Sequence, residues 1–129
     1  MPLRRRSVSE LAVLGLDHVQ VAIPEGGESE ARRFYGELLG LDEVPKPANL
    51  SPSGCWFEAG TLKLHIGVDS DFRPARKAHP AILVSDLAGL RQRFEAAGVA
   101  THDDKPVEGF DRFFAFDPFG NRIELMEAI

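Results

Sequence analysis

The first regular pattern in the chain is a strand followed by a helix. In residues 18–23 apolar side chains occupy every second position, which predicts a half-buried β-strand. In residues 28–39 the apolar side chains recur at helical spacing, and Gly40 follows as a residue that commonly ends helices. The sequence therefore predicts a strand and an amphipathic helix that pack their apolar faces on one core.

This order occurs twice. His18 and His79 are 61 residues apart, and Lys63 and Glu124 are separated by the same 61 residues. The segment around His18 matches the segment around His79, and a second helical pattern follows at residues 87–97. Because two strands and a helix keep one register, the chain is interpreted as two copies of a single unit.

Three shorter strands are predicted after each helix. They lie near residues 43–44, 54–58 and 61–68 in the first copy, and near residues 101–102, 112–117 and 121–127 in the second. The segment Asp117-Pro118-Phe119-Gly120 has the residues of a β-turn, so the last two strands are predicted to form a hairpin. The element order is βαβββ twice, which indicates an α+β fold with helices on one face of mixed sheets.

The strand alternation also predicts what the other face of each sheet carries. The residues that alternate with the apolar positions are His18, Gln20, Lys63, His65, His79, Arg122 and Glu124. A sheet face with this many charged and imidazole side chains is not a second core. We expect it to line a polar, water-filled concavity.

Three of these residues have the chemistry of metal ligands. His18, His79 and Glu124 come from three different predicted strands, and strand parity places all three on the concave side. Two neutral imidazoles and one carboxylate suit a divalent ion such as Zn, Mn, Ni or Fe, and they leave positions for water or substrate. The alternative is that both histidines bond to the backbone at strand edges and that Glu124 is a solvated carboxylate.

Composition and charge narrow the class of protein. The 129 residues suit one domain, and 43% hydrophobic with 27% charged residues is typical of a folded globular chain. A net charge of −5 disfavours nucleic acid as a partner, and no apolar run approaches the ~20 residues of a membrane span. The single cysteine, Cys55, excludes an intrachain disulfide and fits a reducing, cytoplasmic setting.

Three segments carry the features of a known family: residues 16–24 (LDHVQVAIP), 31–41 (ARRFYGELLGL) and 117–125 (DPFGNRIEL). They resemble the vicinal oxygen chelate superfamily, which comprises glyoxalases, bleomycin-resistance proteins and extradiol dioxygenases. The resemblance covers about residues 14–128. It implies a single domain over residues 13–129, in which two βαβββ modules, about residues 13–69 and 77–129, form an incomplete mixed barrel. Residues 1–12 would then be an N-terminal arm.

The resemblance implies metal ligands on the first and last strand of each module. By position these are His18, His79 and Glu124, with Lys63 in a fourth slot where glyoxalase I-type enzymes have a carboxylate. Because lysine is a cation at pH 7 and does not ligate until it loses a proton, lactoylglutathione lyase activity is not expected. His65 has the same parity as Lys63 and would supply a fourth ligand if the strand were shifted or bulged.

The implied function is a metal-dependent enzyme acting on a small oxygen-rich substrate, as a glyoxalase-like lyase or isomerase, a thiol transferase or a dioxygenase. Glu124 and Lys63 are the candidate catalytic residues. The candidate substrate-binding residues are Gln20, Trp56, His65 and Arg122. The alternative is a metal-free protein that sequesters a ligand, as bleomycin-resistance proteins do. Both functions imply a homodimer, and the sequence leaves open whether one chain or two chains build each site.

Overall fold

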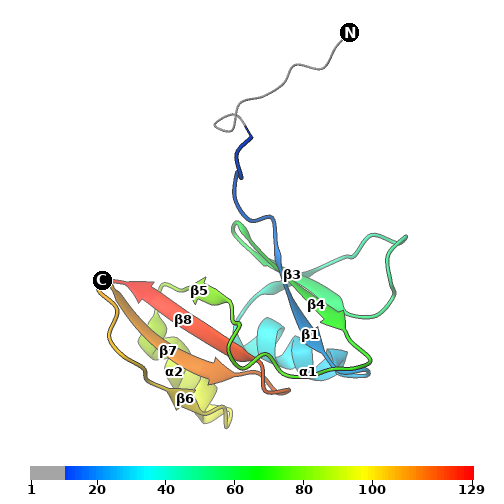
Figure 1. The fold of residues 1–129 in the computed structure, drawn as a ribbon. Coiled ribbons are helices and arrows are strands. Elements are labelled where there is room, and N and C mark those ends of the chain that lie inside the picture. The colour runs from blue at the N-terminus through cyan, green and yellow to red at the C-terminus, as the bar shows by residue number, and fades with distance from the viewer. Residues whose placement is uncertain (1–10) are drawn as a thin grey trace.

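The computed structural model describes residues 11–129, so most of the arm predicted at residues 1–12 lies outside the described part of the chain. The first module contains β1 (Val19–Ile23), α1 (Glu28–Ala31), the π-helical η1 (Arg32–Leu38), β2 (Asp42–Val44), β3 (Cys55–Ala59) and β4 (Leu62–Val68). The second contains β5 (Ala81–Leu83), α2 (Leu87–Ala96), β6 (Thr101–His102), β7 (Phe110–Phe116) and β8 (Arg122–Ala128). Figure 1 shows the two modules side by side, with the helices on the lower side of the sheets.

Each module forms a four-stranded mixed sheet of the same topology. The strand order is β1-β4-β3-β2 in the first sheet and β5-β8-β7-β6 in the second. β1 runs parallel to β4, and β5 runs parallel to β8, whereas the other pairs are antiparallel. This confirms the predicted α+β fold with two βαβββ modules. Within residues 11–129 the sheets do not close, and β1 and β5 lie at their edges.

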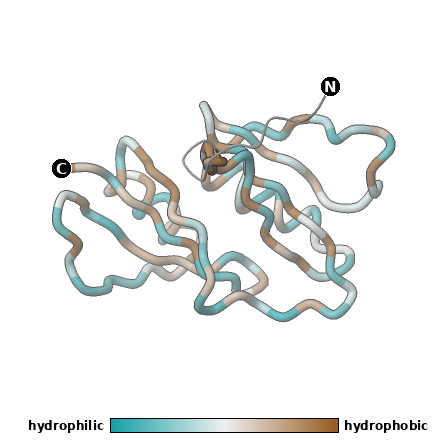
Figure 2. Tube along the Cα trace, turned by 45° about the horizontal axis from the view of Figure 1, so that its top comes forward, coloured by the Kyte–Doolittle hydropathy of each residue, from teal (hydrophilic) through white to brown (hydrophobic). Residues whose placement is uncertain are grey.

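Alternate positions of the strands form the core, as the periodicity predicted. Ile23, Leu64 and Leu125 have no exposed surface, and Figure 2 shows hydrophobic stretches along the strands of both halves. The neighbouring strands add Phe57 and Phe113 to the same core. The apolar core therefore lies between sheets and helices, which leaves the opposite sheet faces for polar side chains.

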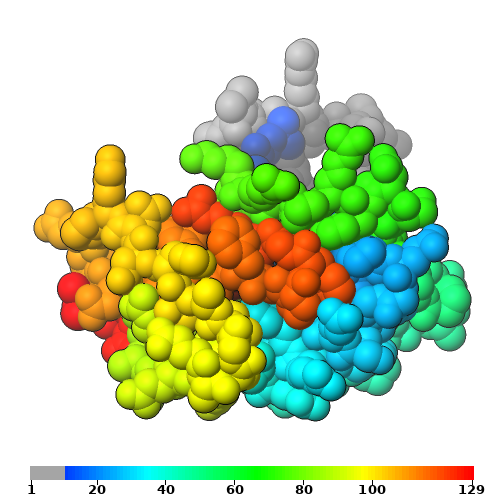
Figure 3. Space-filling view, turned by 90° about the horizontal axis from the view of Figure 1, so that it is seen from below, coloured from blue at the N-terminus to red at the C-terminus, as the bar shows by residue number. Residues whose placement is uncertain are grey.

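The first helix differs from the single helix predicted over residues 28–39. After α1 the backbone widens into η1, where the Leu39 N–H donates to the Phe34 carbonyl at 2.9 Å, five residues back. In this wider turn Phe34 and Tyr35 are both buried. Phe34 meets Phe94 of α2 at 5.4 Å between ring centroids, so the two helices pack together, as seen in Figure 3. Neither these helices nor any other in residues 11–129 is long and apolar enough to cross a membrane.

A buried polar network connects the two modules. The Tyr35 hydroxyl donates to Oδ2 of Asp117 at 2.7 Å, and the Asn121 amide donates to the Ala22 carbonyl at 2.8 Å. Asn121 also donates to Asp117, at 2.9 Å. Burial, with the nearby charge of Asp117, raises the pKa of Tyr35 well above its usual value. The β7–β8 turn is thereby tied to β1 and η1, which sets the position of β8 relative to the first module.

Candidate functional site

His79 and Glu124 meet on the polar face of the second module. His79 precedes β5, and Nε2 of its ring lies 2.9 Å from Oε1 of Glu124 on β8. Its Nδ1 lies 2.8 Å from the Lys77 carbonyl, which can only accept, so Nδ1 carries the proton. In a neutral ring Nε2 then presents a lone pair toward a carboxylate. A divalent cation, or a second proton on the ring, makes this contact favourable.

His18 and His65 form a second pair, on the polar face of the first module. Their rings stack with centroids 4.1 Å apart, and His65 also stacks on Trp56 at 3.8 Å. Nδ1 of His18 lies 2.9 Å from Oδ2 of Asp17, which leaves Nε2 of His18 available as a ligand. Burial, helped by the charge of His18, lowers the pKa of His65 and favours its neutral, ligating form.

The pairing register makes His65, rather than Lys63, the counterpart of Glu124. Gln20 lies opposite His65 in the β1–β4 pair, and Ala81 lies opposite Glu124 in the β5–β8 pair. Gln20 follows His18 by two residues, and Ala81 follows His79 by two residues. The predicted equivalence of Lys63 and Glu124 therefore differs from the structure by a two-residue shift. Such a shift preserves parity, so Lys63 stays on the polar face.

Lys63 lies at the rim of an open cavity of about 780 Å³ in the first module. Its ammonium group lies 3.6 Å from Oδ1 of Asp17, whose other oxygen contacts His18. The cavity is lined by His18, Gln20, Trp56, Glu58, Lys63 and His65. The predicted substrate-binding residues Gln20, Trp56 and His65 thus share one cavity with the predicted ligand His18.

Arg122, the remaining predicted substrate-binding residue, lies in the second module beside an arginine that sequence reasoning missed. Nη1 of Arg112 lies 3.4 Å from Oε2 of Glu124, and Nη2 donates to the Lys105 carbonyl at 2.5 Å. The guanidinium groups of Arg112 and Arg122 both lie over the Phe114 ring, with their Cζ atoms 5.1 and 3.9 Å from its centroid. Strand alternation could have indicated Arg112, because Arg112 and Phe114 are two residues apart and therefore point to the same face of the sheet.

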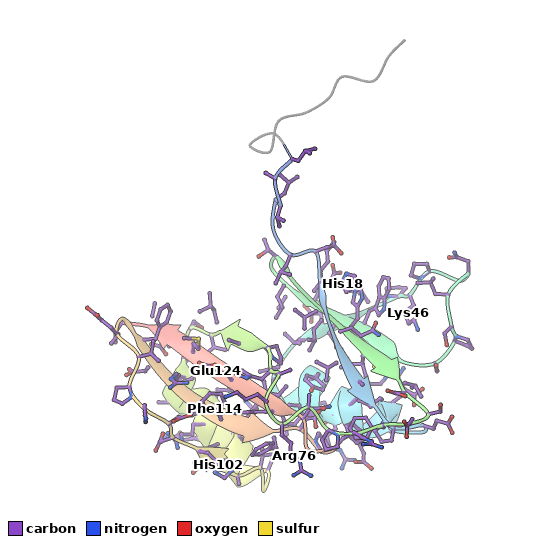
Figure 4. All side chains as sticks on the ribbon, in the orientation of Figure 1. His18, Lys46, Arg76, His102, Phe114 and Glu124 are labelled. Carbon is purple, nitrogen blue, oxygen red and sulfur yellow. The ribbon has the colours of Figure 1, made fainter. Side chains whose placement is uncertain are left out.

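The two pairs of candidate ligands do not meet within one chain. Figure 4 shows His18 on one module and Glu124 on the other. Across residues 11–129, no cluster of three or more His, Cys, Asp or Glu side chains is arranged to hold a metal ion. One chain therefore presents two half-sites on its polar sheet faces. One consists of His18 and His65, and the other of His79 and Glu124.

Comparisons with known proteins agree with this architecture. Residues 15–125 match the family model described as Glyoxalase/Bleomycin resistance protein/Dioxygenase superfamily. No curated protein matches the chain. A solved glyoxalase family protein from Bacillus anthracis is 47% identical, with a TM-score of 0.87 over 92% of this chain and 98% of that chain.

More distant solved structures share the fold. A fosfomycin resistance protein, FosX, from Listeria monocytogenes is 19% identical, with a TM-score of 0.73 over 92% of this chain and 94% of that chain. A glyoxalase family protein from Enterococcus faecalis is 23% identical, with a TM-score of 0.68 over 88% of this chain and 98% of that chain. At these identities the likeness concerns the fold alone.

Proposed function

The chain belongs to the Glyoxalase/Bleomycin resistance protein/Dioxygenase superfamily, and we propose that it is a metal-dependent enzyme acting on a small oxygen-rich substrate. The proposed ligands of the divalent ion (Zn, Mn, Ni or Fe) are His18, His79 and Glu124, with His65 as a fourth. The reaction class is a glyoxalase-like lyase or isomerase, a transferase or a dioxygenase. The proposed setting is the cytoplasm.

The contact between His79 and Glu124 carries the proposal. Nε2 of His79 lies 2.9 Å from Oε1 of Glu124 while the Lys77 carbonyl orients the other ring nitrogen. Metal-binding histidines are commonly oriented in this way by a carbonyl or a carboxylate on the second nitrogen. Asp17 gives His18 the same support. These donors fit a divalent transition metal by residue type and by the free nitrogen of each ring.

A homodimer is the proposed way to complete the site. One chain holds His18 and His65 on one sheet and His79 and Glu124 on the other, and residues 11–129 bring no three such groups together. His18 and His79 lie just before β1 and β5, which are edge strands of their sheets within residues 11–129, and Leu83 of β5 is 71% exposed. A second copy that covers these edges would bring opposite half-sites together and build two equivalent sites.

The bound ion would supply Lewis acidity to two neighbouring substrate oxygens. Around it, Lys63 offers an ammonium group that can donate a hydrogen bond or a proton to a substrate oxygen, and Asp17 holds it at the rim. Gln20 offers an amide from the same cavity wall. Trp56, stacked on His65, forms a flat apolar wall for the substrate. Glu124 keeps one carboxylate oxygen on His79 and the other near Arg112.

The second candidate function is metal-free ligand sequestration of the bleomycin-resistance type. The observation that favours it is the open cavity of about 780 Å³ beside Trp56, which can hold a small molecule without any chemistry. It predicts ligand binding that is independent of metal.

Elemental mass spectrometry on untagged protein tests the proposed function. The protein is incubated with Zn, Mn, Ni or Fe(II) and desalted, and we expect about one ion per chain for at least one metal. His79→Ala and Glu124→Gln should lose that ion. His102→Ala, which removes another histidine of the second module, should retain it. No retained metal under any loading, with the protein folded, would eliminate the enzyme mechanism and leave the sequestering function.

A further inference from the structure

The second half-site is rich in fixed positive charge, although the chain has a net charge of −5. Arg112 and Arg122 both lie against Phe114, with their Cζ atoms 5.1 and 3.9 Å from its ring centroid. Their side chains are only 13% and 22% exposed, so both cations are held in place by the protein. Glu124, the nearest carboxylate to Arg112, already contacts His79 through its other oxygen.

Arg122 has the geometry of an anion-binding residue. The 3.9 Å separation from Phe114 means that the guanidinium lies against the ring and uses its flat face there. The N–H donors of a guanidinium point outward in its plane, so stacking leaves them available for hydrogen bonds. One of them contacts the half-exposed Asp104 at 3.3 Å, which is long for a charge-assisted bond. An oxyanion between Arg122 and the metal ligands would make shorter contacts.

Arg112 contacts neighbouring groups of the protein through its guanidinium group. Nη2 donates to the Lys105 carbonyl and Nη1 approaches Glu124, whereas its buried Nε has no hydrogen-bond partner within the described chain. These contacts place Arg112 beside Glu124. Arg112 is therefore a positioning residue for Glu124, and it adds a buried positive charge beside any ligand.

The linker before β5 extends the positive surface. The backbone N–H of Arg122 donates to the Ala75 carbonyl at 2.9 Å, which fixes the linker beside the start of β8. Arg76 and Lys77 follow Ala75 directly and are exposed. Figure 4 shows Arg76 near the lower end of the second sheet. Their charges would attract an anion toward Arg122.

We propose that the substrate carries an oxyanion, a carboxylate or a phosphonate, which Arg122 binds through two parallel hydrogen bonds beside the Glu124 half-site. This inference rests on the proposed function, because it calls the bound anion a substrate. Anion binding itself does not require the metal. Within residues 11–129 the Arg122 guanidinium has one carboxylate contact, Asp104 at 3.3 Å, so an oxyanion would give its remaining donors stronger acceptors than a neutral ligand would. Two parallel bonds suit the oxygen spacing of both anion types.

The test is a solution NMR titration of the full chain, which resolves the arginine Nε–Hε signals. Glycolate, a carboxylate with a neighbouring hydroxyl, is compared with glycolamide, its neutral analogue of similar shape. Methylphosphonate provides the second anion arm. Each titration is run before and after zinc loading. We expect glycolate or methylphosphonate to shift the Arg122 Nε–Hε signal, and glycolamide to bind at least about tenfold more weakly.

Variants distinguish direct anion binding by Arg122 from a general attraction of anions to positive charge. Arg122→Gln should weaken anion binding by at least about tenfold. Arg122→Lys should weaken anion binding less, because lysine keeps the positive charge although it lacks the planar guanidinium. Arg33→Gln, an exposed arginine on η1, is the matched control and should bind as the original protein does. Backbone spectra of each variant confirm that it is folded.

Two results would overturn the inference: equal binding of glycolate and glycolamide, or unchanged anion affinity in both Arg122 variants. Zinc binding is measured separately in the same samples. Zinc retention without anion selectivity would refute the inference and leave the metal site standing. Anion selectivity without zinc binding would refute the enzyme proposal and leave the oxyanion site standing.

Discussion

Nε2 of His79 and Oε1 of Glu124 lie 2.9 Å apart across the parallel pair of β5 and β8. The carboxylate is only 9% exposed, and its other oxygen faces Arg112 at 3.4 Å. A cation placed between the histidine and the carboxylate would therefore meet donors that the fold already holds in position. This arrangement is the structural basis of the proposed metal site.

Glu124→Gln should weaken divalent-metal affinity by at least about 100-fold, because the amide keeps the shape and removes the charge of the ligand. Isothermal titration calorimetry with zinc measures the change, and His102→Ala serves as the control. The thermal stability of the metal-free variant should stay close to that of the original chain. Unchanged zinc affinity would remove Glu124 from the ligand set.

Asp17→Ala should lower zinc affinity by about 10- to 100-fold, because Asp17 orients the His18 ring through Nδ1. Asp17→Asn should lose less, since the amide oxygen can still accept from the ring. His102→Ala is the control, because it removes a histidine outside the proposed ligand set. Equal zinc affinities for Asp17→Ala and the original chain would mean that Asp17 has no orienting role.

Mixing two variants that each fail to bind zinc tests whether each site is shared between two copies. Neither His18→Ala nor His79→Ala alone should hold zinc tightly. In a mixed dimer, one site would combine the intact His18 half of one chain with the intact His79 half of the other. After exchange, about one quarter of all sites should bind zinc. Absence of recovery, with mixed dimers confirmed by native mass spectrometry, would place each site within one chain.

Tyr35→Phe should destabilise the fold by about 1 to 3 kcal/mol, because it deletes a buried hydrogen bond to Asp117 and leaves the core volume nearly unchanged. Urea unfolding with an unchanged m-value measures this. Folding raises the pKa of Tyr35 above its unfolded value of about 10. The hydrogen bond therefore stabilises the protein fully below about pH 10. Above that pH, the stability advantage over Tyr35→Phe should shrink. A constant advantage up to pH 11 would contradict the buried, protonated phenol.

The Cys55 thiol should be unreactive in the folded protein. Cys55 is 2% exposed, and burial raises its pKa to about 11. At pH 8 its reaction with a disulfide reagent should be more than about 100-fold slower than in urea, because the thiolate is scarce and covered. Rapid labelling of the folded chain would show that β3 opens far more readily than its packing indicates.

Much of the fold could be predicted from the sequence, because strands such as β1 and β4 alternate apolar and polar side chains over much of their length. The predicted strand at residues 61–68 corresponds to β4 (Leu62–Val68), and the predicted final hairpin is formed by β7 and β8. The π-helical widening of η1 was not predicted. Packing of both Phe34 and Tyr35 into the core depends on contacts with the second module, which local periodicity does not contain.

The candidate site could be predicted only in part. Strand parity placed His18, His79 and Glu124 on polar faces, but it could not fix the pairing register. The constant spacing of 61 residues therefore pointed to Lys63, whereas the register makes His65 the counterpart of Glu124. The orienting contacts of Asp17 and Lys77 depend on ring positions, and a sequence pattern does not report these.

The most direct measurement is a crystal structure of the zinc-loaded protein, with anomalous diffraction collected at the zinc edge. The account predicts one anomalous peak per chain, bonded to His18 of one copy and to His79 and Glu124 of the other, with His65 beside it. His79→Ala crystals should lack the peak. A zinc-loaded crystal without that peak, or with zinc bound elsewhere while His79 and Glu124 contact only each other, would contradict the account.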